Sequence, residues 1–322
     1  MTRKFKNYFV VLLKTFVTLG LLWYLFALIE FNYFLEIIKN VKLLPLIIIL
    51  LIYLPNIYLS TLKWHAILKY YKIIYSKSEL FYLYLISGFF NNFLPTSIGG
   101  DSYKYLRLTK KYPTLNKEIL SSIILERGVG FFALFAINII LIPCFTDTIL
   151  NQPIFLGIEL LIAAIFSLII ILLCQRNKTI KCLEKINIKI KLFQKFKNFI
   201  KTLTSINDKK ILINSFCYSI IFIILSAFSA FLLFYALGVQ VNILYIILAC
   251  SITNIFGVLP ISLNSIGVTE GLFVLLFGFY GIETEISLAA AIIARVLMIA
   301  ASSSGGFVYL FKTLKYYVSK TF

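Results

Sequence analysis

The sequence predicts an all-α polytopic membrane protein with about six full transmembrane helices and two re-entrant helical hairpins in an inverted pseudo-repeat. Its 322 residues are 61% hydrophobic and only 14% charged, and the mean hydropathy is +0.95. A soluble fold of this length would be far less apolar. Several apolar stretches also exceed the roughly 18 residues that a membrane-crossing helix needs. We therefore expect one transmembrane domain over residues 1–322.

Six stretches are long and apolar enough to cross the hydrocarbon core of a bilayer. A helix rises about 1.5 Å per residue, so about 20 residues cover the roughly 30 Å of hydrocarbon. The first stretch follows three basic residues, as a signal peptide would, but no small-residue cleavage site comes after it. The predicted spans are residues 8–29, 43–62, 118–143, 154–174, 211–237 and 286–311.

The loops between these spans differ sharply in charge. Residues 63–78 and 102–117 are rich in lysine and arginine, and residues 176–210 carry eleven basic against two acidic side chains, a net charge of +9. In the loop at 281–285 the only charged residues are Glu283 and Glu285. The positive-inside rule then predicts a plasma (inner) membrane protein with cytoplasmic basic loops and cytoplasmic termini. The 176–210 segment is either an amphipathic helix on anionic lipid or an ordinary basic loop.

The first predicted hairpin, residues 79–108, contains the sequence NNFLPTSIGGD at 91–101. Proline and two glycines in this stretch break a helix, and basic loops flank the hairpin on both sides. The limb that returns after Asp101 is about eight residues long and would reach only about 12 Å as a helix. We therefore expect the segment to enter and leave the membrane from the cytoplasm.

A second hairpin, residues 243–280, repeats this pattern in LPISLNSIGVTE at 259–270. Both copies have Leu-Pro, then Ser-Ile-Gly, then an acidic residue. An arginine follows in the next span of each copy: Arg127 comes 26 residues after Asp101, and Arg295 comes 25 after Glu270. The second hairpin has no lysine or arginine and acidic or uncharged flanks, so it should enter from outside. Opposed hairpins of this kind are typical of inverted-repeat transporters.

The two hairpins and the two arginines make up the predicted substrate-binding site. An arginine at the centre of a membrane helix costs about 2.5–3.5 kcal/mol unless it faces a polar cavity or a partner. The acids could hold the arginines, carry a coupling proton, or only cap the short return helices. The candidate residues are Asn92, Pro95, Ser97, Gly99, Gly100, Asp101, Arg127, Asn254, Pro260, Ser265, Gly267, Glu270 and Arg295.

The sequence offers little for cofactor or metal chemistry. Its five cysteines are scattered, and His65 is the single histidine, so zinc, haem and iron–sulfur groups lack ligand sets. There is no Walker A motif for direct use of ATP. We expect no cofactor, no metal and no nucleic-acid partner.

The motifs FNNFLPTSIGGDSYKYLRL, ILERGVGF, LPISLNSIGVTEGLF and AIIARVL resemble those of the lysylphosphatidylglycerol synthase transmembrane-domain family, also called flippase-like membrane proteins. The resemblance implies movement of a phospholipid, or of a polyprenyl-phosphate-linked lipid, between leaflets. The soluble aminoacyltransferase domain of some relatives is not expected here, because the chain ends eleven residues after its last predicted span. We thus expect a non-enzyme whose partners are membrane lipids and a separate lipid-modifying enzyme.

Two other functions remain open from the sequence. One is a membrane-embedded enzyme or accessory protein of glycolipid or cell-envelope synthesis, with Asp101 or Glu270 as a base. The other is a proton-coupled transporter of small solutes. Neither a D-x-D motif nor a soluble nucleotide-sugar domain supports the enzyme.

Overall fold

A computed structural model describes residues 3–93, 99–174 and 208–321 of the chain. These residues form helices joined by short turns, and no strand occurs among them. The prediction of an all-α polytopic membrane protein is therefore confirmed. Residues Pro95 and Ser97 and nearly all of the 176–210 segment lie outside the described residues, so their predicted roles remain predictions.

Five helical stretches of the described chain are long and apolar enough to cross a membrane. They are α3 (Leu43–Tyr70), α6 (Asn116–Leu141) with its continuation through η1 (Ile142–Phe145) and α7 (Thr146–Leu150), α8 (Pro153–Cys174), α11 (Lys209–Ala236) and α14 (Thr284–Thr321). They match five of the predicted spans.

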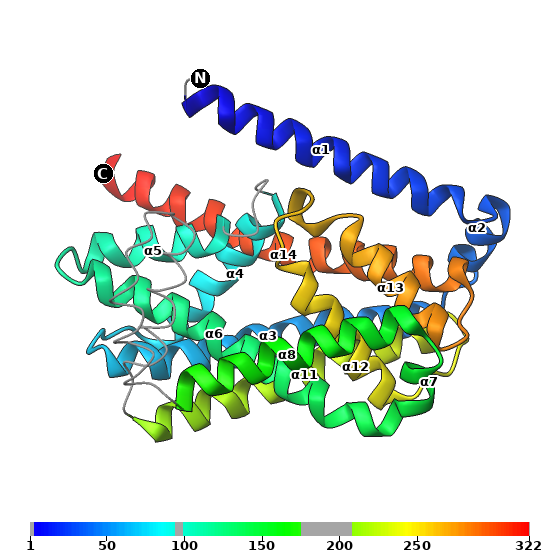
Figure 1. Cartoon of the computed structure of the whole chain (residues 1–322). Helices are drawn as coiled ribbons and strands as arrows, with labels where there is room; N and C mark the ends of the chain where they lie inside the picture. The colour runs from blue at the N-terminus through cyan, green and yellow to red at the C-terminus, as the bar shows by residue number, and fades with distance from the viewer. Residues whose placement is uncertain (1–2, 94–98, 175–207, 322) are drawn as a thin grey trace.

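The sixth predicted span, residues 8–29, is not a straight crossing. It lies in α1 (Arg3–Ala27), which is followed by α2 (Phe31–Lys39) at an angle of 89°. Only together are these two helices long and apolar enough to form one membrane span. In Figure 1, α1 lies along one side of the bundle and α2 turns toward it at the end.

Each predicted hairpin is a pair of short helices packed against each other. The first consists of α4 (Lys77–Phe93) and α5 (Gly99–Lys111), and the second of α12 (Ile243–Gly257), η2 (Leu263–Ser265) and α13 (Val268–Phe279). The longest limb has 17 residues, or about 26 Å of helix, which is less than the roughly 30 Å of a bilayer core. Figure 1 shows that the hairpins start at opposite ends of the bundle and that α4 and α12 run from these ends toward its middle.

The two hairpins have separate hydrophobic cores. The first hairpin packs Leu80, Leu83 and Leu108 against α3 and α6, around the fully buried Trp64. The second packs Phe273 and other side chains of α12 and α13 against α6, α8, α11 and α14. Burying apolar surface in two places fixes each hairpin independently, and leaves the region between their breaks to polar side chains.

Close backbone contacts join the hairpins to their neighbours. A Cβ on Gly305 of α14 would lie 1.9 Å from the Leu85 carbonyl oxygen of α4, so the close approach of α14 to α4 at this point requires a glycine. At the other hairpin, the Thr18 side chain of α1 accepts a hydrogen bond from the Leu263 N–H at 2.9 Å.

One predicted boundary is wrong. The span predicted to end at residue 62 continues as α3 to Tyr70. Lys63, which we assigned to a cytoplasmic loop, therefore lies inside a helix, and its side chain is only 13% exposed. A basic residue at the end of an apolar run predicts the end of a membrane span, but Lys63 lies 3.9 Å from Glu126 within the protein.

Candidate functional site

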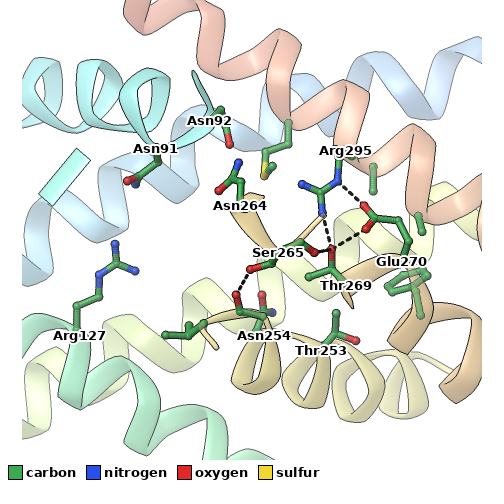
Figure 2. Close-up of a pocket in the computed structure, with 16 residues that line it drawn as sticks. Asn91, Asn92, Arg127, Thr253, Asn254, Asn264, Ser265, Thr269, Glu270 and Arg295 are labelled. Atoms are coloured by element: carbon green, nitrogen blue, oxygen red, sulfur yellow. Dashed lines mark hydrogen bonds and ion pairs between the residues drawn. The ribbon is translucent and has the colours of Figure 1, made fainter. Parts of the chain in front are cut away.

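A polar cavity of about 390 Å³ lies between the two hairpins, beside the last turns of α4 and α12. Arg127 of α6 and Arg295 of α14 reach it from opposite sides, as Figure 2 shows. The other polar lining residues come from both hairpins and are Asn91, Asn92, Thr253, Asn254, Asn264, Ser265, Thr269 and Glu270. Side chains that are far apart in the sequence thus face one shared space.

A second cavity of about 380 Å³ adjoins the first. The two have Asn91, Arg127, Asn254 and Val258 in common. The second cavity extends toward α3 and is also lined by the charged residues Lys63, Lys104 and Glu126. Arg127 therefore stands where the two cavities meet.

The first hairpin holds Arg127 through Asp101. Both Nε and Nη2 of Arg127 lie 3.0 Å from Asp101 Oδ2. Asp101 is in the first turn of α5, where unpaired N–H groups favour a carboxylate. The Arg127 side chain remains 44% exposed, so this pair leaves part of the guanidinium open to the cavity.

The start of α5 is fixed by Gly100. Its N–H donates a hydrogen bond to Asn91 Oδ1 at 2.8 Å, and its carbonyl accepts one from Ser87 Oγ at 3.1 Å. A Cβ on Gly100 would lie 2.3 Å from the Ser87 carbonyl oxygen. A side chain there would push α5 away from α4 and move Asp101 away from Arg127.

A charge network extends from Asp101 into the second cavity. The Lys104 ammonium lies 3.6 Å from Asp101 and 3.5 Å from Glu126, and Lys63 lies 3.9 Å from Glu126. With Arg127, three cations face two carboxylates, which leaves one net positive charge. Lys104 is also 3.7 Å from the centre of the Tyr84 ring, a cation–π contact that stabilises it away from water.

The second hairpin holds Arg295 in the equivalent way. Arg295 Nε donates to Glu270 Oε1, and its Nη2 donates to Thr269 Oγ1. Glu270 also accepts a hydrogen bond from the Gly267 N–H at 2.6 Å. Glu270 therefore caps α13 and pairs with the arginine at once, so the two interpretations of this acid are compatible.

Gly267 is required at the start of α13 for its conformation. Its φ is +85°, a left-handed value that favours glycine. A Cβ there would also lie 2.7 Å from the Leu21 Cβ of α1. The backbone turn that presents the Gly267 N–H to Glu270 thus depends on both the glycine and the neighbouring helix.

The predicted site residues fall into three groups in the structure. Asn92, Arg127, Asn254, Ser265, Glu270 and Arg295 line the first cavity. Gly100, Asp101 and Gly267 do not line that cavity but contact residues that do, and Gly99 is buried at the start of α5. Pro260 is exposed in the turn after α12 and does not line either cavity, so its inclusion among residues that contact substrate is not supported by its position.

Sequence reasoning missed several lining residues. Lys63 and Lys104 were counted as basic loop charges, and Glu126 was not among the candidates. The spacing of Lys104, three residues after Asp101 on a helix, is a signal that could have placed both on one face. Asn91, Asn264 and Thr269 had no such signal, because polar residues beside a helix break are common.

The arrangement is suited to binding an anion. The seven charged side chains of the two arginine clusters comprise four cations and three carboxylates. Amide and hydroxyl groups add neutral hydrogen-bond donors. Among residues 3–93, 99–174 and 208–321, no group of three or more His, Cys, Asp and Glu side chains could hold a metal ion.

Comparison with known proteins gives two matches. The sequence model described as the lysylphosphatidylglycerol synthase TM region matches residues 11–303. The chain is also similar to a UPF0104 membrane protein of Methanothermobacter thermautotrophicus, with 21% identity over 276 residues, which cover 79% of this chain and 81% of that protein.

Proposed function

This chain belongs to the family of the lysylphosphatidylglycerol synthase transmembrane region, and from that premise we propose that it is a flippase-like translocase. It would move the headgroup of a phospholipid or of a polyprenyl-phosphate-linked lipid between leaflets, leaving the lipid chemically unchanged. The partners are then membrane lipids and a separate lipid-modifying enzyme, and the protein itself is not an enzyme.

One observation carries this proposal: two arginines from opposite halves of the molecule face the same polar cavity between two broken hairpins. A lipid translocase must give a charged headgroup a polar path while the acyl chains remain in hydrocarbon. Arginine binds phosphate oxygens with paired, geometrically fitted hydrogen bonds. A phosphate between Arg127 and Arg295 would be met from both sides.

The carboxylates give the empty site a stable state. Without lipid, Asp101 and Glu270 neutralise Arg127 and Arg295, which avoids the cost of unpaired charges at membrane depth. An incoming phosphate competes with these carboxylates for the guanidinium groups. Helices α5 and α13 begin beside the cavity, so their N-terminal N–H groups would add favourable dipoles for the anion.

The charge pattern of the loops predicts how the protein is oriented in the membrane. We propose cytoplasmic termini in the plasma membrane, with the first hairpin entering from the cytoplasm and the second from outside. Each arginine would then be accessible from a different leaflet when its hairpin moves. Net transfer requires the phosphate to pass from Arg127 to Arg295, or in the reverse direction.

The direct test is lipid movement in proteoliposomes that contain the purified full-length protein and a fluorescent phospholipid. A membrane-impermeant reductant reports how fast inner-leaflet label reaches the outer leaflet. We expect acceleration by the wild type and by Lys69→Gln, an exposed-site control. Arg127→Gln and Arg295→Gln should each reduce the rate at least tenfold.

The same preparation separates the other functions. Covalent change of a polyprenyl-phosphate lipid by the purified protein would indicate an enzyme. Proton-dependent uptake of a polar solute that lipids do not inhibit would indicate a solute transporter. Wild-type lipid movement by the Arg127→Gln and Arg295→Gln variants would contradict the proposed site.

A further inference from the structure

We infer that a groove at the base of the first hairpin, distinct from the two central cavities, binds the headgroup of an anionic phospholipid. The groove has a volume of about 630 Å³ and is formed by α4, α5 and α14 with the turn before α4. Lipid binding by the groove does not depend on the proposed translocase function. A role of the groove as a loading site for the central cavities does rest on that function.

The groove is strongly basic at one end. Arg107 and Lys110 of α5 and Lys312 of α14 line it, and all three are exposed. Glu79 is its single lining acid, and that carboxylate already lies 3.8 Å from the Lys111 ammonium. Among the described residues, neither Arg107, Lys110 nor Lys312 has a carboxylate within 4 Å. Three cations are therefore available to an anion.

The other end of the groove is apolar and aromatic. Leu83 and Ile86 of α4, Tyr103 of α5 and Tyr309 of α14 line this end. The rings of Tyr103 and Tyr309 lie 5.0 and 5.5 Å from the ring of Phe90, centre to centre, so aromatic side chains of all three helices meet at this end.

The polarity runs in the same direction on α4 and α5. Along α4, Glu79 comes before Leu83 and Ile86 in the direction of the break; along α5, Tyr103 is nearer the break than Arg107 and Lys110. Seven residues separate Glu79 from Ile86, or about 10 Å of helix. An upright phospholipid has this polarity, with its phosphate at the membrane surface and its chains toward the midplane. A soluble anion would use the basic end alone.

A hydrogen bond between α4 and α14, the two helices that line both spaces, lies between the groove and the first cavity. Asn92 of α4 donates a hydrogen bond to Ser302 of α14 at 2.7 Å. Asn92 lines the first cavity, whereas Ile86 and Tyr309 of the same two helices line the groove. A lipid held in the groove thus stands next to the cavity that would receive its headgroup.

The test measures phosphatidylglycerol and phosphatidylcholine bound to the purified full-length protein, by native mass spectrometry after mixed-lipid exchange. Each basic residue near a membrane surface contributes about fivefold to binding of anionic lipid. We expect Arg107→Gln/Lys110→Gln/Lys312→Gln to lower phosphatidylglycerol retention at least tenfold, with phosphatidylcholine unchanged. Lys69→Gln/Lys117→Gln/Lys209→Gln is the matched control, since these side chains are exposed and outside the groove.

Several outcomes would overturn the inference. An equal loss in the control triple variant would mean general surface charge, and no loss in the groove variant would mean no site. Displacement of the lipid by glycerol phosphate alone would identify a soluble anion instead. Should the triple variant misfold, Lys110→Gln and Lys312→Gln separately should each lower retention about fivefold. If the wild-type protein retains the lipid but does not move it between leaflets, that result would contradict the proposed translocase function but not lipid binding in the groove.

Discussion

At the scale of single residues, the site depends on how each arginine is neutralised. Arg295 is 17% exposed and bonded to both Glu270 and Thr269. Arg127 is 44% exposed and belongs to a network with one surplus positive charge. We expect the Arg127–Asp101 pair to separate more readily than the Arg295–Glu270 pair. When it separates, water can solvate the exposed Arg127, and Lys104 remains beside Asp101.

The pair between Asp101 and Arg127 gives a testable double-mutant cycle. Asp101→Asn raises the net charge of this cluster from +1 to +2, and Arg127→Ala lowers it to 0, whereas the double variant returns it to +1. Breaking a fully buried pair costs about 3–5 kcal/mol. Because the Arg127 side chain is 44% exposed, the single variants should lose less than this, seen as a partial loss of folded yield. The double variant should recover yield in size-exclusion chromatography but should not recover lipid movement.

Wild-type lipid movement by that double variant would show that the two residues serve the architecture alone. The parallel cycle with Glu270→Gln and Arg295→Ala is the matched comparison in the other half. A larger loss of yield is expected there, because this pair is less exposed.

Glu159 of α8 gives a second prediction at this scale. It is 3% exposed, and neither carboxyl oxygen has a hydrogen-bond partner. No cation lies within 4 Å of it among the described residues, while Asn138, beside it, has an unpartnered Oδ1. An isolated buried carboxylate is too costly to remain ionised, so we expect a neutral acid whose O–H can donate to Asn138.

Because glutamine imitates a neutral carboxylic acid, Glu159→Gln should keep the wild-type melting temperature in detergent. Glu159→Ala should lose about 1–3 kcal/mol, the usual penalty when a buried polar group loses its partner. Equal destabilisation by both substitutions, measured by thermal unfolding at neutral pH, would argue against a neutral Glu159.

At the scale of elements, the hairpins are held by close helix contacts rather than by length. Helix α14 packs along α4 through Gly305 and Gly306, where a Cβ would meet the Leu85 carbonyl oxygen at 1.9 Å and the Phe89 ring at 2.8 Å. Small residues permit such approach in membrane proteins, where packing replaces the hydrophobic effect between helices. This contact sets the position of Asn92 against Ser302, between cavity and groove.

Gly305→Ala should therefore be strongly destabilising, because the added methyl group meets a backbone oxygen that cannot rotate away. Overpacking usually costs about 1–3 kcal/mol. Gly306→Ala should cost less, since the Phe89 ring can move. Gly157→Ala on α8 is the control: apart from its own helix turn, no atom of the described residues lies within 4 Å of its added Cβ, and its melting temperature should stay level or rise. A tolerated Gly305→Ala would refute the close α4–α14 contact.

At the scale of the whole molecule, the hairpins enter the bundle from opposite ends. Long apolar side chains cover the outside, among them Leu160 and Leu168 of α8, which are 62% and 53% exposed. Such exposure suits contact with lipid chains and would not suit water. The protein thus has polar cavities inside a lipid-facing shell, which is the reverse of a soluble fold.

This arrangement predicts the sides of the membrane. In a variant whose five native cysteines are replaced, Lys110→Cys should react with an impermeant maleimide only after the cytoplasmic face is opened. Glu283→Cys, near the opposite end, should react in intact cells. Labelling of Lys110→Cys in intact cells would contradict re-entry of the first hairpin from the cytoplasm, and a protected Glu283→Cys would contradict the outer loop.

The membrane class, five of the spans, both helix breaks and the correspondence of Asp101–Arg127 with Glu270–Arg295 could all be predicted from the sequence alone. These features can be recognised in the sequence because a charge, a proline or a glycine inside an apolar run raises the free energy of a membrane helix. Such a residue is therefore expected only where a partner or a polar cavity compensates this cost.

The contacts between helices that are distant in the sequence could not be predicted and came from the three-dimensional arrangement. The network of Lys63, Lys104 and Glu126, the 89° bend after α1 and the groove between α5 and α14 all depend on which helix faces cross. The angle and position at which two helices cross depend on the shapes of the side chains on both of them. Hydropathy describes each helix separately and does not contain this information. A lysine that ends an apolar run therefore looks the same in the sequence whether it meets water, as at Lys69, or a buried glutamate, as at Lys63.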